Sequence, residues 1–250
     1  MKIKKILSLL LTFGVIFANI AYAKDYSDYP QKYWDLDKSH WAYSYISELT
    51  DKKVIEGFED GSFKPDKTVT RAEWSKLICI ASGKMIANSD VTCAVDYKTS
   101  DWYSPYINTI KDYINFYVVD DKYYFKPNQA ITREDVTVSL VKLKGYDLSE
   151  VDYSNITKFS DFNSISNSLK VYISVAISNE LIKGFEDNTF RAQDTLTRAE
   201  AATLLCRAFQ LCRCNFSIEK IMRGFRGGRI WPLGNCLYEI CFYADTRGSG

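Results

Sequence analysis

Histidine is nearly absent from the 250 residues, with His40 as the single copy. A Ser-His-Asp triad would need that side chain, and it lies inside a repeated motif instead. No glycine-rich phosphate-binding motif is present either. The acidic pairs at 59–60 and 186–187 lie in duplicated turns, which favours turn chemistry over a glycosidase pair. The sequence therefore predicts no catalytic residue, no cofactor and no metal site.

Long apolar runs are missing after residue 20. The run at residues 6–20 follows a basic Met-Lys-Ile-Lys-Lys and precedes Ala-Tyr-Ala at 21–23. This order predicts a secretory signal peptide over residues 1–23, with an uncleaved membrane anchor as the alternative. We therefore expect an exported protein that has no contact with the membrane after cleavage.

A strong charge of either sign is missing, because the net charge is only +1. Basic residues are concentrated in residues 1–23 and 212–250, so the part between them is mildly acidic. An acidic surface argues against nucleic-acid binding. Hydrophobic residues at 46% and charged residues at 25% also exclude a disordered or collagen-like chain.

What the sequence does contain is a repeat. Thr-Arg-Ala-Glu at residues 70–73 recurs at 197–200, and Thr-Arg-Glu-Asp stands at 132–135. The surrounding residues keep the same offsets, including an aspartate that opens each unit at Asp35, Asp96 and Asp161. Such self-similarity indicates repeated supersecondary units.

The repeat predicts three units over residues 30–84, 91–146 and 156–210. Apolar spacing predicts a first helix from about Trp41 to Lys53 in the first unit. A turn and an irregular loop follow, and a second helix starts at Thr70. Threonine at the N-cap with glutamate three residues later is a capping box, and Asp135 makes a weaker version in the second unit. The predicted fold is all-α, built from helix–loop–helix units.

Seven cysteines are distributed unevenly, and four of them lie after residue 211. Cys79 and Cys206 occupy the same repeat position, where the second unit has Val141, so we expect a small buried helix position there. A bond between these two cysteines is conceivable if their helices meet. Residues 211–250 continue no repeat and are rich in Cys, Arg and Gly. They indicate an out-of-frame extension, with a metal module as the less suitable alternative because no histidine is present.

The repeats resemble the S-layer homology (SLH) domain of bacterial cell-surface proteins. The motif that carries the resemblance in the first unit consists of Asp35, residues 40–42, Ile46, residues 54–58, residues 60–63, Pro65 and residues 70–73. The resemblance implies three units around a pseudo-threefold axis with a central helix bundle. It also implies non-covalent cell-wall anchoring, through an anionic and often pyruvylated secondary cell-wall polymer attached to peptidoglycan. The polymer would bind in grooves between neighbouring units.

Three arginines are the main candidates for polymer binding: Arg71, Arg133 and Arg198. Each stands at the first position of a helix, where the macrodipole disfavours a cation. Exposed helix amides beside a guanidinium would form a carboxylate site. The alternative is a structural pair with an acid such as Asp35 or Asp60. We expect alanine at each arginine to keep the fold and to reduce binding unequally.

The remaining candidates flank these arginines. The resemblance gives Trp41 and Trp102 a sugar-stacking role, with core packing as the alternative, and the third unit has Ser168 there. Gly57 and Gly184 are expected to supply a positive φ or a close ligand approach. Asp60 and Asp187 lie in the same turns. The second unit has Val118-Val119 and one extra loop residue at this point, so we expect unequal grooves.

Two other functional classes stay open at this stage. The chain would be a remnant of a larger surface enzyme of the glycan-hydrolase class, or an S-layer array protein with the repeats as its anchor. The oligomeric state is not predicted.

Overall fold

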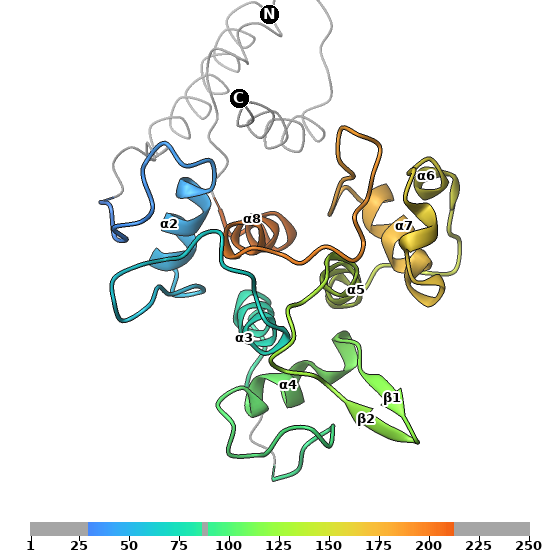
Figure 1. Ribbon diagram of the computed structural model, residues 1–250, viewed down its shortest axis with the longest axis horizontal. Coiled ribbons are helices and arrows are strands. Elements are labelled where there is room, and N and C mark those ends of the chain that lie inside the picture. The colour runs from blue at the N-terminus through green and yellow to red at the C-terminus, as the bar shows by residue number, and fades with distance from the viewer. Residues whose placement is uncertain (1–29, 87–89, 213–250) are drawn as a thin grey trace, which may run out of the picture. The chain divides into compact units, whose positions relative to one another are not determined.

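The computed structural model describes residues 30–86 and 90–212 (Figure 1). The predicted signal peptide and the tail beyond residue 212 lie outside the described residues. Helices dominate the described part, which confirms the all-α class, and one small two-stranded sheet is the exception there. No helix in the described part is long and apolar enough to cross a bilayer.

The elements follow one another in the order that the repeat predicts. The first unit contains α2 (Tyr43–Asp51) and α3 (Arg71–Ala81). The second contains α4 (Ser104–Ile110), η2 (Lys111–Tyr113), β1 (Tyr117–Val119), β2 (Lys122–Tyr124) and α5 (Arg133–Lys144). The third contains α6 (Ser154–Thr157), η3 (Phe162–Ser164), η4 (Asn167–Leu169), α7 (Lys170–Ser178) and α8 (Arg198–Phe209). The first helix, α2, is shorter at both ends than the sequence predicts.

The predicted capping boxes are present on α3 and α8. Thr70 and Thr197 each accept a hydrogen bond from the amide of the glutamate three residues later, and that glutamate accepts one from the threonine amide. On α5 Thr132 accepts from the Asp135 amide, but the return bond is missing from the structure. The aspartate is one methylene shorter than glutamate, so its carboxylate is free for another partner.

The long helices pair between units and not within them. Helix α2 packs on α8, α4 packs on α3, and α7 packs on α5. Figure 1 shows α3, α5 and α8 in the middle of the described part, with α2, α4 and α7 farther out. The first helix of each unit therefore completes the core of another unit. The last helix, α8, packs on the first, α2, so the third unit also contacts the first.

Three extended segments before the central helices meet in a closed cycle of backbone hydrogen bonds. The Val69 amide donates to Leu196, the Leu196 amide to Ile131, and the Ile131 amide to Val69, at N···O distances of 2.9, 3.3 and 2.9 Å. All three side chains are buried. This cycle fixes where the three central helices begin.

The aspartate that opens each unit holds that unit's loop. Both carboxylate oxygens of Asp35 accept backbone amides, from Phe63 and Lys64, at 2.7 Å each. Asp96 and Asp161 accept from residues 125–126 and 190–191 in the same way. One carboxylate thereby satisfies two amides that secondary structure leaves without partners.

Each unit has one aromatic ring that packs against the phenylalanine of its loop. In the first and third units this ring comes from the residue two positions before the opening aspartate. Tyr33, two residues before Asp35, lies 5.3 Å from the Phe63 ring, and a Cβ on Gly57 would meet the Tyr33 ring at 2.2 Å. Phe159 packs against Phe190 in the third unit, and a Cβ on Gly184 would likewise meet its ring at 2.2 Å.

The second unit reverses this arrangement. Ala94 stands where the others have Tyr33 and Phe159. The central arginines donate Nη2 to the carbonyls of Glu56, Asn115 and Lys183, so Phe116, and not Val118-Val119 as the sequence indicated, stands where the other units have glycine. The Phe116 ring lies 5.6 Å from Phe125. The departure that the sequence showed in this turn is thus a β-hairpin, β1–β2, which turns at Asp120-Asp121, both with positive φ.

The cysteines partly follow expectation. Cys79 is fully buried in α3, which confirms a core position, and burial raises the pKa of its thiol. Cys206 is buried too, but its disulfide partner is Cys212 and not Cys79.

Candidate functional site

The Arg198 site consists of Arg198 together with Glu56, Phe58 and Phe63 of the first unit. Arg198 Nε donates to the Phe63 carbonyl at 2.8 Å and Nη2 to the Glu56 carbonyl at 2.7 Å. The guanidinium carbon lies 4.9 and 4.4 Å from the centroids of the Phe58 and Phe63 rings. Cation–π contact and two carbonyl bonds thus fasten the start of α8 to the first unit.

The Arg133 site repeats this pattern between α5 and the third unit, with Lys183, Phe185 and Phe190. Arg133 Nε donates to the Phe190 carbonyl at 3.0 Å, and Nη2 donates to the Lys183 carbonyl. The Phe185 and Phe190 centroids lie 4.9 and 5.1 Å from the guanidinium carbon. In both sites Nη1 makes no hydrogen bond to the described residues, although Arg198 as a whole is only 7% exposed.

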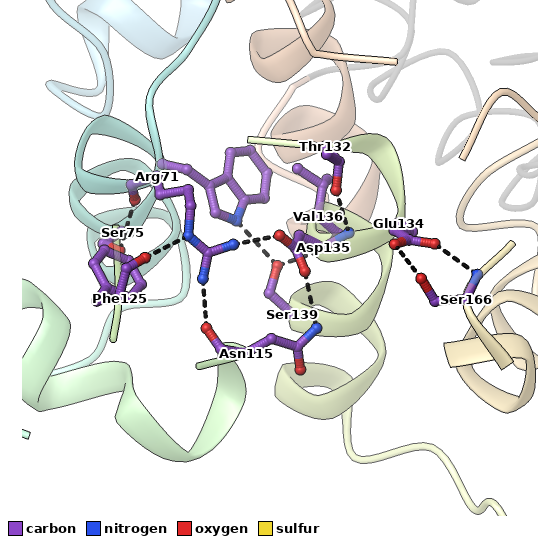
Figure 2. Close-up of polar contacts among 11 residues, drawn as sticks. Arg71, Ser75, Asn115, Phe125, Thr132, Glu134, Asp135, Val136, Ser139 and Ser166 are labelled. Carbon is purple, nitrogen blue, oxygen red and sulfur yellow. Dashed lines mark hydrogen bonds and ion pairs between the residues drawn. The ribbon is translucent and has the colours of Figure 1, made fainter. Parts of the chain in front are cut away.

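The Arg71 site, made with Asn115, Tyr117 and Phe125 of the second unit, differs at Nη1. Figure 2 shows Arg71 with Asn115, Phe125 and Asp135. Nε donates to the Phe125 carbonyl at 2.7 Å and Nη2 to the Asn115 carbonyl, as in the other sites. Nη1, however, makes an ion pair with Asp135 of α5. The Arg71 side chain is only 2% exposed. The structural alternative thus holds for this arginine, with an acid that the sequence did not suggest.

The helix amides contradict one part of the expected anion site. The first two amides of α3 donate to Gln129 and Pro127 carbonyls, at 2.9 and 3.0 Å. Equivalent bonds join α5 to residues 192 and 194, and α8 to residues 65 and 67. The third amide of each helix donates to the capping threonine. These amides are not free for a ligand, because the loop of another unit reaches them first. Of the expected carboxylate site, only the guanidinium could still bind a ligand.

The same geometry alters the expected effect of removing an arginine. Each guanidinium joins two units through carbonyl bonds and two aromatic rings, so alanine there removes a structural fastening as well as a charge. We therefore expect such variants to lose stability as well as binding, and the retention of their fold stays a prediction.

Burial leaves two of the guanidiniums weakly compensated. Burial is the largest cause that lowers the pKa of Arg133 to about 10; the Arg191 charge acts in the same direction, and Glu200 and Asp194 oppose it. Burial also lowers the pKa of Arg198, against the opposite effect of Glu73. Both arginines stay charged at neutral pH, and an anion at Nη1 would stabilise the charged form.

A second basic residue lies beside each arginine. Lys64 Nζ lies 4.4 Å from the Phe58 centroid, Lys126 Nζ lies 4.0 Å from Tyr117, and the Arg191 guanidinium carbon lies 4.0 Å from Phe185. All three have a positive φ, between 57° and 61°. A non-glycine residue in this region is strained, and such strain is concentrated at functional sites. The sequence shows the match of residues 63–65 with 125–127, but sequence reasoning did not single out Lys64, Lys126 and Arg191 as candidate binding residues.

The predicted tryptophans lie at the surface, which excludes full core burial. Trp41 is 45% exposed and stacks on His40, and Trp102 is 56% exposed beside Tyr103 and Tyr106. The structure records no contact between either indole and the three arginines. Trp34, which the sequence did not single out, is 70% exposed, and its Nε1 donates to the Asp60 carbonyl at 3.1 Å.

The predicted glycines and aspartates shape the turns. Neither Gly57 nor Gly184 has a positive φ, so that expectation is wrong; the close approach is to Tyr33 and Phe159. Each glycine directly follows a carbonyl that an arginine binds, namely Glu56 and Lys183.

Asp60 and Asp187 each accept from the backbone and hydroxyl two residues later, and form ion pairs with Lys64 and Arg191 at 3.0 and 2.9 Å. Hydrogen bonds from Ser62 and Thr189, respectively, are the largest cause that lowers the pKa of both carboxyls to about 2. The two aspartates thus stabilise the turns and partly neutralise the outer cations.

Comparison with protein-family models identifies the family of these repeats. The family model described as the S-layer homology domain matches residues 32–73 and 158–202. The chain carries S-layer homology domains. The two matched segments hold Asp35 and Asp161 and both complete capping boxes, and the model does not match the second unit, where the hairpin and Asp135 depart from the pattern.

Relatives of this S-layer homology chain are surface proteins and enzymes. It is 30% identical over 201 residues to an amylopullulanase from Thermoanaerobacterium thermosulfurigenes, covering 77% of this chain and 10% of that protein. It is 32% identical over 174 residues to the exoglucanase XynX of Acetivibrio thermocellus, covering 67% and 15%. A cellulosome-anchoring protein of A. thermocellus is 30% identical over 161 residues, covering 62% and 35%.

The chain therefore spans only a tenth to about a third of the length of these relatives. The S-layer homology domain is an anchoring domain and not a catalytic one, and it places the protein at the cell-wall surface. Within the described residues, no group of histidine, cysteine or acidic side chains could hold a metal ion.

Proposed function

We propose that the chain anchors to the bacterial cell wall by binding an anionic secondary cell-wall polymer at its inter-unit arginine sites. The observation that carries this proposal is that Nη1 of Arg133 and of Arg198 makes no hydrogen bond within the described residues. Each guanidinium is already oriented by two carbonyl bonds, so a ligand carboxylate would gain a charge-assisted bond without ordering the side chain.

The surroundings of these arginines suit a sugar acid. Phe185 is 37% exposed, and its ring centroid lies 4.9 Å from the Arg133 guanidinium carbon and 4.0 Å from that of Arg191, so two cations contact one aromatic ring. Phe58 has the same relation to Arg198 and Lys64. An aromatic face supports a sugar ring, and the flanking cations favour a carboxylate such as a pyruvyl group. Trp41 and Trp102 stay candidates for further stacking.

Co-sedimentation with cell-wall sacculi tests the proposal. One sacculus preparation would be intact and the other acid-stripped of its secondary polymer. We expect the full chain to pellet with intact walls only, and less at high salt, because part of the attraction is between exposed charges. Equal pelleting would indicate peptidoglycan as the ligand, and no pelleting with either would refute anchoring by this chain.

Variants assign the binding to the sites. Arg133→Gln and Arg198→Gln should each weaken pelleting, with thermal unfolding recorded to separate loss of binding from loss of fold. Lys98→Gln is the matched control, because it removes one exposed positive charge outside the three sites. Full binding by both arginine variants would contradict the arginine mechanism.

The enzyme and array alternatives are tested separately. The relatives named as an amylopullulanase and an exoglucanase favour the idea that such a segment accompanies an enzyme. Relatives named as S-layer proteins favour a role in an array. Release of reducing sugar from soluble glycans by the purified chain would support the first, and lattice formation under electron microscopy the second. We expect neither and propose that the chain is not an enzyme.

A further inference from the structure

Each central arginine faces the acidic residue at the third position of the next central helix. Arg71 is paired with Asp135 of α5, and the charges of Glu200 and Glu73 act on Arg133 and Arg198, respectively. The three sites thus share an acid at the same helix position, but only in the Arg71 site does that acid form an ion pair with the guanidinium.

Side-chain length decides what that carboxylate does. Glu73 and Glu200 turn back and accept the amides of their own capping threonines, at 2.8 Å each. Glu73 is held further by Lys67 at 2.8 Å. Among the described residues, neither glutamate forms an ion pair with an arginine. In these two sites the capping box keeps the internal acid away from the guanidinium.

Asp135 is too short to close its capping box and turns to the arginine instead (Figure 2). One carboxylate oxygen binds Arg71 Nη1, and the other accepts from Asn115 Nδ2 at 3.0 Å. The Asp135 side chain is 11% exposed. All three guanidinium nitrogens of Arg71 then have partners within the protein.

We propose that Asp135 acts as a built-in anion that closes the Arg71 site to acidic glycan, so that polymer binding depends on the Arg133 and Arg198 sites. The inference rests on the proposed function. A ligand carboxylate would have to displace Asp135 and leave a nearly buried charge without its partner, which is strongly unfavourable. Lys126 is the cation left near Tyr117 in this site, and an ammonium lacks the planar fork that binds a carboxylate at two points.

Reciprocal substitutions at the third helix position test this inference without removing any arginine. Asp135→Glu gives α5 the residue that α3 and α8 have, so the capping box can close and free Arg71 Nη1. Glu200→Asp makes the opposite change in front of Arg133. With intact sacculi, we expect Asp135→Glu to bind several-fold more tightly, by roughly the gain that a third site adds to avidity. Glu200→Asp should bind about tenfold more weakly, the loss of one charge-assisted bond.

Arginine variants complete the cycle. Arg71→Gln in the Asp135→Glu background should lose the affinity that Asp135→Glu adds. Thermal unfolding of each variant shows whether the fold is retained, and the Asp135→Glu result stands even if Arg71→Gln unfolds.

The outcomes separate the two claims. If the unchanged chain does not pellet with intact walls, the proposed function fails and this inference fails with it. If the unchanged chain pellets and Asp135→Glu changes nothing, the polymer binds elsewhere or already binds at Lys126, and only the closure by Asp135 is wrong. Equal losses from a folded Arg71→Gln and from Arg133→Gln would overturn it as well.

Discussion

At the scale of single residues, two positions in each unit share one space. In the first and third units the ring comes from the N-terminal segment, as Tyr33 or Phe159, and the turn has a glycine, Gly57 or Gly184, without a side chain. Ala94 with Phe116 does the opposite. The glycines therefore serve packing, and the sequence argument for a positive φ failed because the ring that excludes a Cβ lies more than twenty residues away.

A substitution at Gly57 follows from this packing. Gly57→Ala should reduce the free energy of unfolding by about 1–3 kcal/mol, because its Cβ would have to displace the Tyr33 ring or the Ser62 carbonyl. Urea unfolding measures the loss. Tyr33→Leu in the same chain should recover part of it, and an unchanged midpoint for Gly57→Ala would contradict the packing argument.

The second unit gives the complementary experiment. Phe116→Gly should cost about 1–3 kcal/mol, less than the loss of a fully buried ring, because the Phe116 side chain is only partly buried. Adding Ala94→Tyr should restore a substantial part of that stability, because it supplies the ring from the other position. A double-mutant cycle measures the coupling between the two sites, and strictly additive effects would show that the rings do not share a space.

At the scale of elements, the turns that contain Asp60 and Asp187 carry the clearest pH dependence. The pKa of both carboxyls is about 2 in the folded chain, below the ordinary value of 3.8. Their stabilising effect is therefore complete above about pH 4 and is lost as the pH falls toward 2.

Urea midpoints between pH 6 and pH 2 measure this dependence. Asp60→Asn together with Asp187→Asn should flatten the acid limb of the curve relative to the unchanged chain. Asp121→Asn, at the exposed hairpin tip, is the comparison that removes a carboxylate without such hydrogen bonds. Identical acid limbs in all three chains would refute the assignment to these turns.

Elements also show how far the sequence could be used for prediction. Capping boxes and apolar spacing located α3, α5 and α8, because these signals depend on neighbours within one helical turn. The β1–β2 hairpin, the ring exchange and the Arg71–Asp135 pair were not predicted. Each depends on residues from different segments, and for the site the sequence named the arginines but not the carbonyls, rings and acid around them.

At the scale of the whole described part, no unit contains its own complete core. Because α2 packs on α8 and α7 on α5, removing the third unit deprives the first unit's α2 and the second unit's α5 of partners. It also removes Leu196 from the cycle with Val69 and Ile131. The described part should therefore unfold as one cooperative body.

Truncation tests this cooperativity. A chain that lacks residues 156–250 should lose near-ultraviolet circular dichroism and amide-exchange protection in α2, α3 and α5 together. A chain that ends at residue 212 keeps every described element and should retain a single sharp transition. Persistent protection in the first two units of the shorter chain would show that they fold independently.

The ring exchange also has a genetic consequence. Repeated gene segments recombine with one another, and such exchange tends to make the copies alike. A crossover between the segment that encodes Tyr33 and the one that encodes Phe116 would put two rings in one space, and the reciprocal product, Ala94 with Gly57, would leave a void. Either product folds less well than its parents, so the reversed ring acts as a barrier that keeps the second copy distinct. Its separate chemistry, including Asp135, can then be inherited as one block.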